Sequence, residues 1–402
     1  MTLEAKSPTS QDTTALDTDP AGDGAAPADG PEPAASPPLD ADKQVEYSVS
    51  GGLARRLHQL GVSLCFTSYQ SGLVYFVGRN PAGGINVHQV GLPKPMGLSR
   101  DADGGLTLAV DFQILRFQNV LEPDQRINAT FDACYVPRGV HVTGRLDAHD
   151  VGVDGDGRPI FVNTRFNCLA TVSQRHSFEP LWTPSFISGL VDEDRCHLNG
   201  LAMEDGRPRY VTAVSRSNTI DGWRDRRVDG GIVIDVDDNK VIADGLSMPH
   251  SPKVHDGALW VLNSGTGELG VIERGKRGRF KPHVFCPGFV RGLAFHRNFA
   301  FVGLSKPRYK RFEGLALEDR LKQADSEPWC GVQIIDLASG TCVDWFRIDG
   351  KVAELYDVEV LPGFACPMAV APNSGEAASL ITHLPDDRAA TAEPSNEAAP
   401  RS

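Results

Sequence analysis

The sequence lacks several features that would assign it to a familiar class. Its eight cysteines are scattered over 402 residues with no Cys-x-x-Cys pair, which gives no sign of a disulfide framework. No apolar run approaches the length of about 18 residues that a membrane span needs. The first ten residues, MTLEAKSPTS, have no basic start and no apolar core, unlike a signal peptide. We therefore expect a cytoplasmic protein with no membrane partner.

Positive charge is also scarce, and the formal net charge is −12. Much of the excess lies at the chain ends. Residues 1–43 carry nine acidic residues against two lysines, and residues 373–402 carry five against two arginines. The middle of the chain is therefore close to neutral. Because nucleic-acid binding needs a basic surface, we expect no nucleic-acid partner.

Large apolar residues are almost absent from both chain ends, which are rich in Ala, Pro, Asp and Ser. Such segments cannot bury enough apolar surface to offset the entropy lost on ordering. We predict disordered tails at residues 1–47 and 371–402, and one folded domain at residues 48–370.

Helix-forming runs are few, whereas glycine is abundant with 41 residues. This composition favours many short strands joined by tight turns. Six segments share one pattern, in which a distinctive leading residue begins a short apolar strand. In most of them a Gly or Asp-Gly turn and a second strand follow. The six leading residues are Met96, His149, Asn199, His250, Arg291 and Tyr356.

The leading residues are separated by 53, 50, 51, 41 and 65 residues. A period near 50 residues built from short strands is typical of β-propeller blades. A two-sheet sandwich, the main alternative, does not predict the same motif six times. The sequence therefore predicts an all-β propeller.

The two ends of the repeat complement each other. YDVEVLPG at 356–363 has no clear second strand after it, and VSLCFTSYQSGLVYFVG at 62–78 has no leading strand before it. The second fragment is similar to strands two and three of the fourth copy, LWVLNSGTGELGVI at 259–272. A shared blade would protect the sheet edges that an open arc exposes. We predict a six-bladed β-propeller closed by N- and C-terminal strands that share one blade.

The longest interval contains an insertion. FEGLALEDRLKQA at 312–324 has leucines among charged residues and predicts a helical loop in the fifth blade. GVQIIDLASGTCVDWFRI at 331–348 then predicts a hairpin turning at 338–340. The basic run KPRYKR at 306–311 is either a solvated face or a gate at which Lys306 and Arg308 attract an anionic substrate.

The first strand of each propeller blade lines the central channel, so the leading residues are expected to form a ring near one mouth. His149 and His250 supply imidazoles, and Asn199 supplies an amide oxygen, for a zinc-like divalent transition metal. His197 is either a further ligand or a residue of the rim. The alternative is structural, with core histidines bonded to neighbouring blades and a turn-capping amide.

The rest of the ring suggests catalytic roles. Arg291 would hold a carboxylate or oxyanion, and Tyr356 would donate a proton. The alternatives are a salt bridge from Arg291 to Glu354 or Asp357, and an aromatic plug at Tyr356.

Three other side chains belong to this hypothesis. Asp150 and Asp357 follow leading residues and would orient the ring from behind. Met96 completes the ring as packing or as a substrate contact.

Two familiar catalytic patterns are not supported. No GxSxG or HGGG-like arrangement is present, so a nucleophile-elbow hydrolase is unsupported. NSGTG at 263–267 looks like a phosphate loop but leads into no helix, so we interpret it as a hairpin turn.

Two enzyme families resemble this pattern. NGLAMEDGRPRYVT at 199–212 is similar to the Asn-Gly blade start of gluconolactonase and strictosidine-synthase-like propellers, which implies a metal ligand at Asn199. Those lactonases add acidic ligands, whereas this ring has His149 and His250, which suit Ca²⁺ poorly. The ring also resembles that of the peptidyl-amidating lyases. These are six-bladed propellers with a histidine-bound zinc and a catalytic Arg and Tyr. Arg291 and Tyr356 are residues of the same types.

Residues 50–372 as a whole resemble an uncharacterised bacterial family of conserved hypothetical propeller proteins. The similar stretches are SGGLARRLHQLGVSLCFTSYQSG, MPHSPKVHDGALWVLNSGTGELG and RGLAFHRNFAFVGLSKPR. This resemblance implies the fold and the domain limits but brings no established activity.

Together these patterns predict a metal-dependent hydrolase or lyase with its site at the channel mouth. Its substrate would be a small molecule or peptide with an anionic group. The alternative is a non-catalytic propeller that serves as a platform for protein partners, with the ring only closing the channel.

Overall fold

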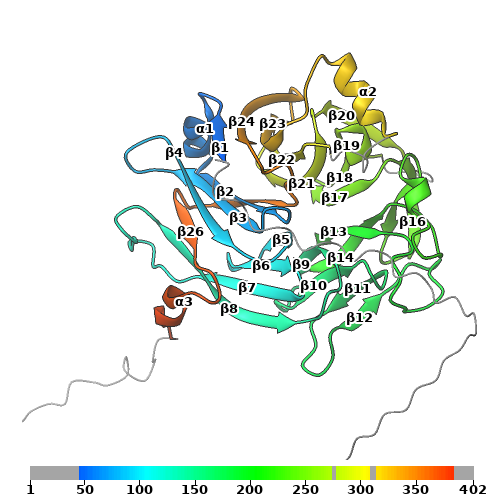
Figure 1. Cartoon of the computed structure of the whole chain (residues 1–402), viewed down its shortest axis with the longest axis horizontal. Coiled ribbons are helices and arrows are strands. Elements are labelled where there is room, and N and C mark those ends of the chain that lie inside the picture. Colours follow the sequence, from blue (N-terminus) through cyan, green and yellow to red (C-terminus); the bar gives the residue numbers. More distant parts are fainter. Residues whose placement is uncertain (1–44, 274–277, 308–313, 384–402) are drawn as a thin grey trace, which may run out of the picture. The chain divides into compact units, whose positions relative to one another are not determined.

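The computed structural model describes residues 45–273, 278–307 and 314–383. These residues form six sheets of mainly antiparallel strands, arranged around a common centre (Figure 1). The six-bladed β-propeller is thus confirmed. Among the described residues, no helix combines the length and the hydrophobicity needed to cross a membrane.

We number the blades by their leading residues. Blade one contains β5 (Pro95–Arg100), β6 (Leu106–Val110), β7 (Gln113–Asn119) and β8 (Ala133–Val142). Blade two contains β9 (Ala148–Val153), β10 (Pro159–Asn163), β11 (Cys168–Thr171) and β12 (Glu179–Trp182). Blade three contains β13 (Leu198–Glu204), β14 (Arg207–Ala213), β15 (Gly231–Asp235) and β16 (Lys240–Leu246), with the 3-10 turn η1 (Arg224–Arg226) before β15.

The other three blades have the same plan. Blade four contains β17 (Pro249–His255), β18 (Ala258–Asn263), β19 (Glu268–Ile272) and β20 (Phe280–Phe285), with the 3-10 turn η2 (Ser264–Thr266) between β18 and β19. Blade five contains β21 (Phe289–His296), β22 (Phe299–Ser305), β23 (Cys330–Asp336) and β24 (Thr341–Asp349). Blade six contains β25 (Val358–Pro362), β2 (Val62–Ser68), β3 (Leu73–Arg79) and β4 (Ile85–Gly91).

The two chain ends close the ring as predicted. β25, from the C-terminal side, pairs antiparallel with β2, from the N-terminal side, so that Phe66 lies opposite Val358. Two further pairings involve the ends. β1 (Glu46–Val49) forms the outer edge of blade five beside β24, and β26 (Pro367–Ala369) pairs in parallel with β8 at the outer edge of blade one. Three of the six blades therefore depend on strands from a chain end.

The residue after each leading residue contacts the innermost strand of the next blade. Polar residues and glycines alternate at this position around the ring. In blades two, four and six this residue is polar and accepts a backbone N–H from the next blade. Asp150 accepts from Leu201 at 2.8 Å, Ser251 from Gly292 at 3.0 Å, and Asp357 from Leu98 at 2.8 Å. In blades one, three and five the residue is a glycine: Gly97, Gly200 and Gly292.

The glycines let adjacent innermost strands approach closely. A Cβ atom at Gly97 would lie 2.6 Å from the Cα of Asp150, and one at Gly292 would lie 2.6 Å from the backbone nitrogen of Val358. These distances are shorter than van der Waals contact allows. The alternation of a polar clamp and a glycine thus fixes the spacing of the strands that line the channel.

Helix α1 (Leu53–Leu60) covers the junction between blades five and six. Its leucines at 53, 57 and 60 lie on one face and are buried in a cluster that includes Phe66 and Phe346. The helix ends at Gly61, which has φ of 66°, a left-handed conformation that glycine adopts without strain.

The insertion in blade five contains α2 (Ala316–Gln323), in agreement with the predicted helical loop. Leu317 and Leu321 pack with Trp223, Met248 and Phe289. As described below, these three residues flank the ring of leading residues. The β23–β24 hairpin is also present, with a turn between Asp336 and Thr341.

The predicted disordered tails fall mainly on residues 1–44 and 384–402, which lie outside the described residues. Between residues 371 and 383 the structure contains the short helix α3 (Gly375–Ser379). Ala377 of this helix and Leu380 after it pack against Cys134 and Val136 of β8.

Candidate functional site

The leading residues occupy equivalent places at one end of the innermost strands. Four of them, Met96, His149, Asn199 and His250, are the second residue of their strand. Arg291 is the third residue of β21, and Tyr356 lies two residues before β25. Neighbouring innermost strands contact one another around the channel. The sequence-predicted ring therefore has a common location in the fold.

His149 and His250 have the same hydrogen-bonding environment. Nδ1 of His149 donates to the backbone oxygen of Asp147 at 2.8 Å and lies 2.7 Å from the hydroxyl of Thr164. Nδ1 of His250 donates to the backbone oxygen of Met248 at 2.8 Å and lies 3.0 Å from the hydroxyl of Ser264. Ser264 belongs to the NSGTG segment, which is a turn between β18 and β19, as predicted.

The two hydroxyls tie each imidazole to the next blade. Thr164 donates to the backbone oxygen of Leu198 at 2.7 Å, and Ser264 donates to that of Val290 at 2.6 Å. Each hydroxyl therefore uses its hydrogen on the neighbouring blade and offers a lone pair to the imidazole. The alternative interpretation placed these histidines in hydrogen bonds to the backbone of neighbouring blades. The structure contains such a link, but it passes through a bridging hydroxyl.

This environment determines the tautomer of both rings. A backbone oxygen can only accept a hydrogen bond, so Nδ1 must carry the proton, and in the neutral ring Nε2 keeps its lone pair. Burial lowers the pKa of His149 to about 4. Burial and the nearby Arg291 lower the pKa of His250 well below its ordinary value. At neutral pH both rings are therefore uncharged and present Nε2 as an acceptor or metal ligand.

His197 lies immediately before β13, with φ of 52°, and not on the strand itself. Its ring is 4.8 Å from that of His149 between centroids and stacks on Trp223 at 4.1 Å. Its Nδ1 bonds to a carboxylate oxygen of Asp194 at 2.7 Å. His197 thus joins the ring as a third imidazole with Nδ1 held by an oxygen.

Asn199 has an orientation that differs from that of an oxygen ligand. Its Oδ1 accepts from the hydroxyl of Thr212 at 2.7 Å, and its Nδ2 lies 3.4 Å from Nε2 of His250. In this arrangement the amide oxygen is engaged within its own blade, and the amide N–H faces the imidazole. Asn199 therefore fits a hydrogen-bond donor better than the oxygen ligand expected from the sequence.

Arg291 and Tyr356 lie against each other on the opposite part of the ring. The Arg291 guanidinium carbon is 5.4 Å from the centre of the Tyr356 ring and 4.8 Å from that of Phe289. The Tyr356 ring lies 5.8 Å from the His149 ring between centroids. The Tyr356 hydroxyl and Nε of Arg291 are buried and have no hydrogen-bond partner among the described residues. Both atoms are therefore available to a bound molecule.

Glu354 also belongs to the site. From the sequence it was expected only as a salt-bridge partner of Arg291. A nitrogen of Arg291 lies 3.6 Å from its carboxylate, and the hydroxyl of Tyr69 donates to the same carboxylate oxygen. The side chain is 2% exposed, and burial raises the pKa of Glu354 to about 7, against the opposing effect of Arg291. Near neutral pH this carboxyl group can both give and take a proton.

Asp150 and Asp357 do not contact the ring side chains through their hydrogen bonds. Their carboxylates accept backbone N–H groups, from Val151 and Leu201 for Asp150 and from Val358 and Leu98 for Asp357. Asp150 and Asp357 therefore join neighbouring blades, whereas the sequence had led us to expect that they orient the ring side chains.

The three residues expected to contact substrate differ in their placement. Met96 is buried in the ring, and its backbone oxygen accepts from Thr67 at 2.6 Å. Lys306 follows β22 and forms an ion pair with Asp349 at 3.7 Å. Arg308 lies outside the described residues.

The residues two positions before the leading residues form a second layer of the site. The first four members of this set have positive φ values between 44° and 52°, a conformation rare outside glycine. In two of them this geometry turns the backbone oxygen onto the imidazole of the leading histidine. The six residues are Lys94, Asp147, His197, Met248, Phe289 and Glu354.

This second layer could have been found from the sequence by aligning the six repeats two residues earlier. Within it, Lys94 forms an ion pair with Asp147 at 2.7 Å. Burial raises the pKa of Asp147, but His149, which is protonated at the low pH where Asp147 titrates, and Lys94 outweigh burial and lower it overall. Asp147 is therefore a fixed negative charge beside the imidazoles.

The donor set suits a transition metal in its chemistry. Histidines that bind zinc usually have their other ring nitrogen hydrogen-bonded to a carbonyl or carboxylate oxygen, and His149, His197 and His250 all have this arrangement. Within the described ranges, no three His, Cys, Asp or Glu side chains are already placed so that they could hold one metal ion. The imidazoles would therefore have to draw together around an ion.

Comparisons with solved structures give low similarity over much of the chain. The chain is 11% identical to a chain of a nidogen/laminin complex, covering 75% of this chain and 99% of that one with a TM-score of 0.43. It is 14% identical to a gluconolactonase from Xanthomonas campestris, covering 68% and 78% with a TM-score of 0.39. It is 11% identical to virginiamycin B lyase from Staphylococcus aureus, covering 76% and 99% with a TM-score of 0.36. These values are too low to transfer an activity.

Among curated proteins, none matches the chain significantly. A family model described as a domain of unknown function, DUF4915, matches residues 51–370. This range covers the propeller from just before α1 to just after β26 and includes every described residue of the ring. The chain therefore belongs to the DUF4915 family.

Proposed function

We propose that the channel mouth is the active site of a hydrolase or lyase that acts on a small molecule or peptide with an anionic group. A zinc-like divalent cation, held by imidazoles of the ring, would support the chemistry. One observation carries this proposal. Neutral imidazoles lie in the same ring as the Tyr356 hydroxyl and Nε of Arg291, two buried polar groups that have no hydrogen-bond partner among the described residues.

Unpartnered polar atoms are costly when buried, by about 1–3 kcal/mol each. A ring that served only to close the channel would be expected to use apolar or satisfied side chains. Here the buried Tyr356 hydroxyl and Arg291 Nε remain unpartnered among the described residues. A bound molecule that accepts from both would remove this cost, which favours a binding role.

The proposed metal ligands are Nε2 of His149, His197 and His250. Each ring has its Nδ1 held by an oxygen of the protein, which leaves a lone pair on Nε2 of the neutral ring. When bound, a zinc-like ion would polarise a carbonyl group or activate water. Metal binding at Nε2 of His250 would displace the amide N–H of Asn199, which lies 3.4 Å from that nitrogen.

The protein groups have separable roles in this proposal. Arg291, held between the rings of Phe289 and Tyr356, would bind the anionic group of the substrate. The Tyr356 hydroxyl would donate a hydrogen bond to the substrate, because burial raises its pKa well above the ordinary value and keeps it protonated. Glu354, whose pKa is raised to about 7 by burial, would be the general acid or base of the site near neutral pH.

Metal binding by the purified protein tests the proposal. We expect close to one equivalent of Zn²⁺ per chain by elemental analysis, and heat on titration of Zn²⁺ into the metal-free protein. His149→Gln and His250→Gln should each lose most of this binding. His283→Gln is the matched control, because His283 is exposed on β20, away from the ring.

Two results would contradict zinc binding by the ring histidines. A wild-type protein that stays metal-free after incubation with Zn²⁺, while folded, would remove the metal from the proposal. Binding that survives in both ring variants would place the metal elsewhere. Either outcome would favour the alternative, a propeller that serves as a platform for protein partners.

A further inference from the structure

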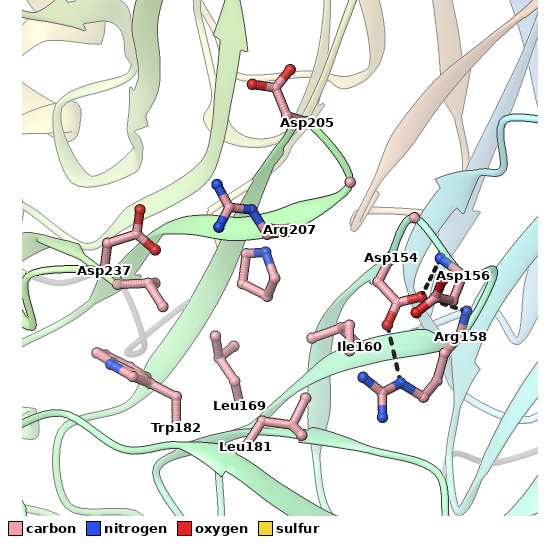
Figure 2. A pocket seen from close by; sticks show the side chains of 14 residues that line it. Asp154, Asp156, Arg158, Ile160, Leu169, Leu181, Trp182, Asp205, Arg207 and Asp237 are labelled. Carbon is pink, nitrogen blue, oxygen red and sulfur yellow. Dashed lines mark hydrogen bonds and ion pairs between the residues drawn. The ribbon is translucent and has the colours of Figure 1, made fainter.

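A groove lies between blades two and three, at the opposite end of their innermost strands from the ring (Figure 2). The strands β9 and β13 begin near His149 and Asn199 and end at the turns that line the groove. Its cavity volume is about 500 Å³. The groove is therefore separate from the proposed active site.

The walls are held together by contacts between the two blades. The backbone nitrogen of Gly155 donates to the backbone oxygen of Gly206 at 2.9 Å, which joins the β9–β10 and β13–β14 turns. Asn239 accepts from the backbone of Ser185 at 2.9 Å and donates to that of Thr183 at 3.0 Å. These bonds make the groove a fixed feature of the junction.

The floor is apolar. Figure 2 shows Ile160, Leu169, Leu181 and Trp182 near one another, below the strand that carries Arg207. Leu181 is 44% exposed, which is high for a leucine. Nε1 of Trp182 is buried and has no hydrogen-bond partner in the part of the chain that the structure describes. The groove thus offers an apolar surface on its floor.

The rim is predominantly acidic, with four carboxylates against the two guanidinium groups of Arg158 and Arg207. Asp154 pairs with Arg158 at 3.0 Å. Asp237 shares Arg209 with Asp235, at 2.9 and 2.6 Å. The carboxylates of Asp156 and Asp205 are exposed and form no ion pair within the described residues. The four carboxylates therefore exceed the two guanidinium groups of the lining by two charges, with Arg207 on the same turn as Asp205.

We propose that this groove binds a short basic peptide segment of a partner protein. An apolar side chain of the peptide would lie on Leu181 and Trp182, and its lysines or arginines would face Asp156 and Asp205. Residues 1–43 of this chain, with nine acidic residues against two lysines, lack the positive charge that this proposal requires of the peptide.

Fluorescence polarisation with labelled peptides tests this proposal on the full chain. The probe is the hexapeptide KKFLKK, compared with EEFLEE, which reverses the charge, and KKSSKK, which removes the apolar anchor. We expect KKFLKK to bind at least about tenfold more tightly than EEFLEE and about fivefold more tightly than KKSSKK. Added salt should weaken KKFLKK binding, because exposed charges are screened.

Substitutions locate the binding. Asp156→Asn combined with Asp205→Asn, and separately Leu181→Ser, should each weaken KKFLKK binding about fivefold or more. Asp124→Asn is the matched control, since Asp124 is an exposed acid of blade one outside the groove. Melting temperatures equal to wild type would show that the variants fold.

Three outcomes would overturn the proposal. One is no binding of KKFLKK at about 1 mM peptide. Another is equal binding of KKFLKK and EEFLEE. The last is an unchanged affinity in both groove variants, which would place the peptide elsewhere.

Discussion

The carboxylate of Asp357 in blade six accepts the backbone N–H of Leu98 in blade one at 2.8 Å, across the junction where the two ends of the repeat meet. Its other oxygen accepts the N–H of Val358 at 2.9 Å. Asp150 makes the same pair of bonds between blades two and three. One oxygen of a buried carboxyl group thus joins blade six to blade one, and the other bonds to the next residue of its own strand.

Replacing one of these oxygens should destabilise the fold. In Asp357→Asn the amide nitrogen would face one of the two N–H donors, which would lose its acceptor. We expect a loss of about 1–3 kcal/mol in the free energy of unfolding, measured by chemical denaturation. Asp124→Asn, at an exposed position, should change stability by less than about 0.5 kcal/mol. Equal stability of the two variants would contradict the clamp.

The glycines between neighbouring innermost strands lead to a second prediction. Gly97→Ala would place a Cβ atom 2.6 Å from the Cα of Asp150, so the neighbouring strands must move apart. We expect a loss of at least about 2 kcal/mol. Gly51→Ala is the control, because a Cβ atom there meets nothing within 4 Å. A thermal denaturation that finds the two variants alike would show that the strands are not closely packed.

Glu354 predicts a pH dependence of stability. Burial raises its pKa from 4.5 to about 7, so the folded protein binds this proton more tightly than the unfolded chain. The free energy of unfolding should therefore fall as the pH rises from about 4.5 to about 7, by up to about 3 kcal/mol from this group.

The variant Glu354→Gln isolates this effect, because glutamine does not titrate. Between pH 5 and pH 8 the wild type should lose stability relative to the variant, by denaturation at each pH. A stability difference that stays constant over this range would show that the carboxyl group keeps an ordinary pKa.

The cysteines differ in their accessibility. All eight are free thiols, of which seven are buried and Cys342 is exposed. In the folded protein we expect iodoacetamide to modify Cys342 first, and the other seven only after unfolding. Mass spectrometry of tryptic peptides reports the order. Early modification of Cys196 or Cys286 in the native protein would contradict the buried positions, and Cys342→Ser should leave the native protein unlabelled.

The repeat pattern in the sequence was sufficient to predict the propeller and its closure, because each blade has its leading residue and strands in the same order. The pairings of β1 with β24 and of β26 with β8 were not predicted. Each joins strands more than 200 residues apart and occurs once, so no repeat marks it.

The candidate site was predicted in part. The ring of leading residues has the expected location, since its position in each innermost strand follows from the repeat. The orientation of Asn199 depends on Thr212, and the tautomer of His149 on the backbone of Asp147. Such details depend on hydrogen bonds that no spacing in the sequence reveals. Glu354 was missed as a titrating group because its pKa is set by burial.

Anomalous diffraction at the zinc edge, from crystals grown with Zn²⁺, tests the central claim most directly. The proposal predicts one strong peak in the channel, within coordination distance of Nε2 of His149, His197 and His250. A variant with His149→Gln and His250→Gln should lose that peak and keep the fold. An ordered protein with no zinc among these three imidazoles would contradict the proposed metal site.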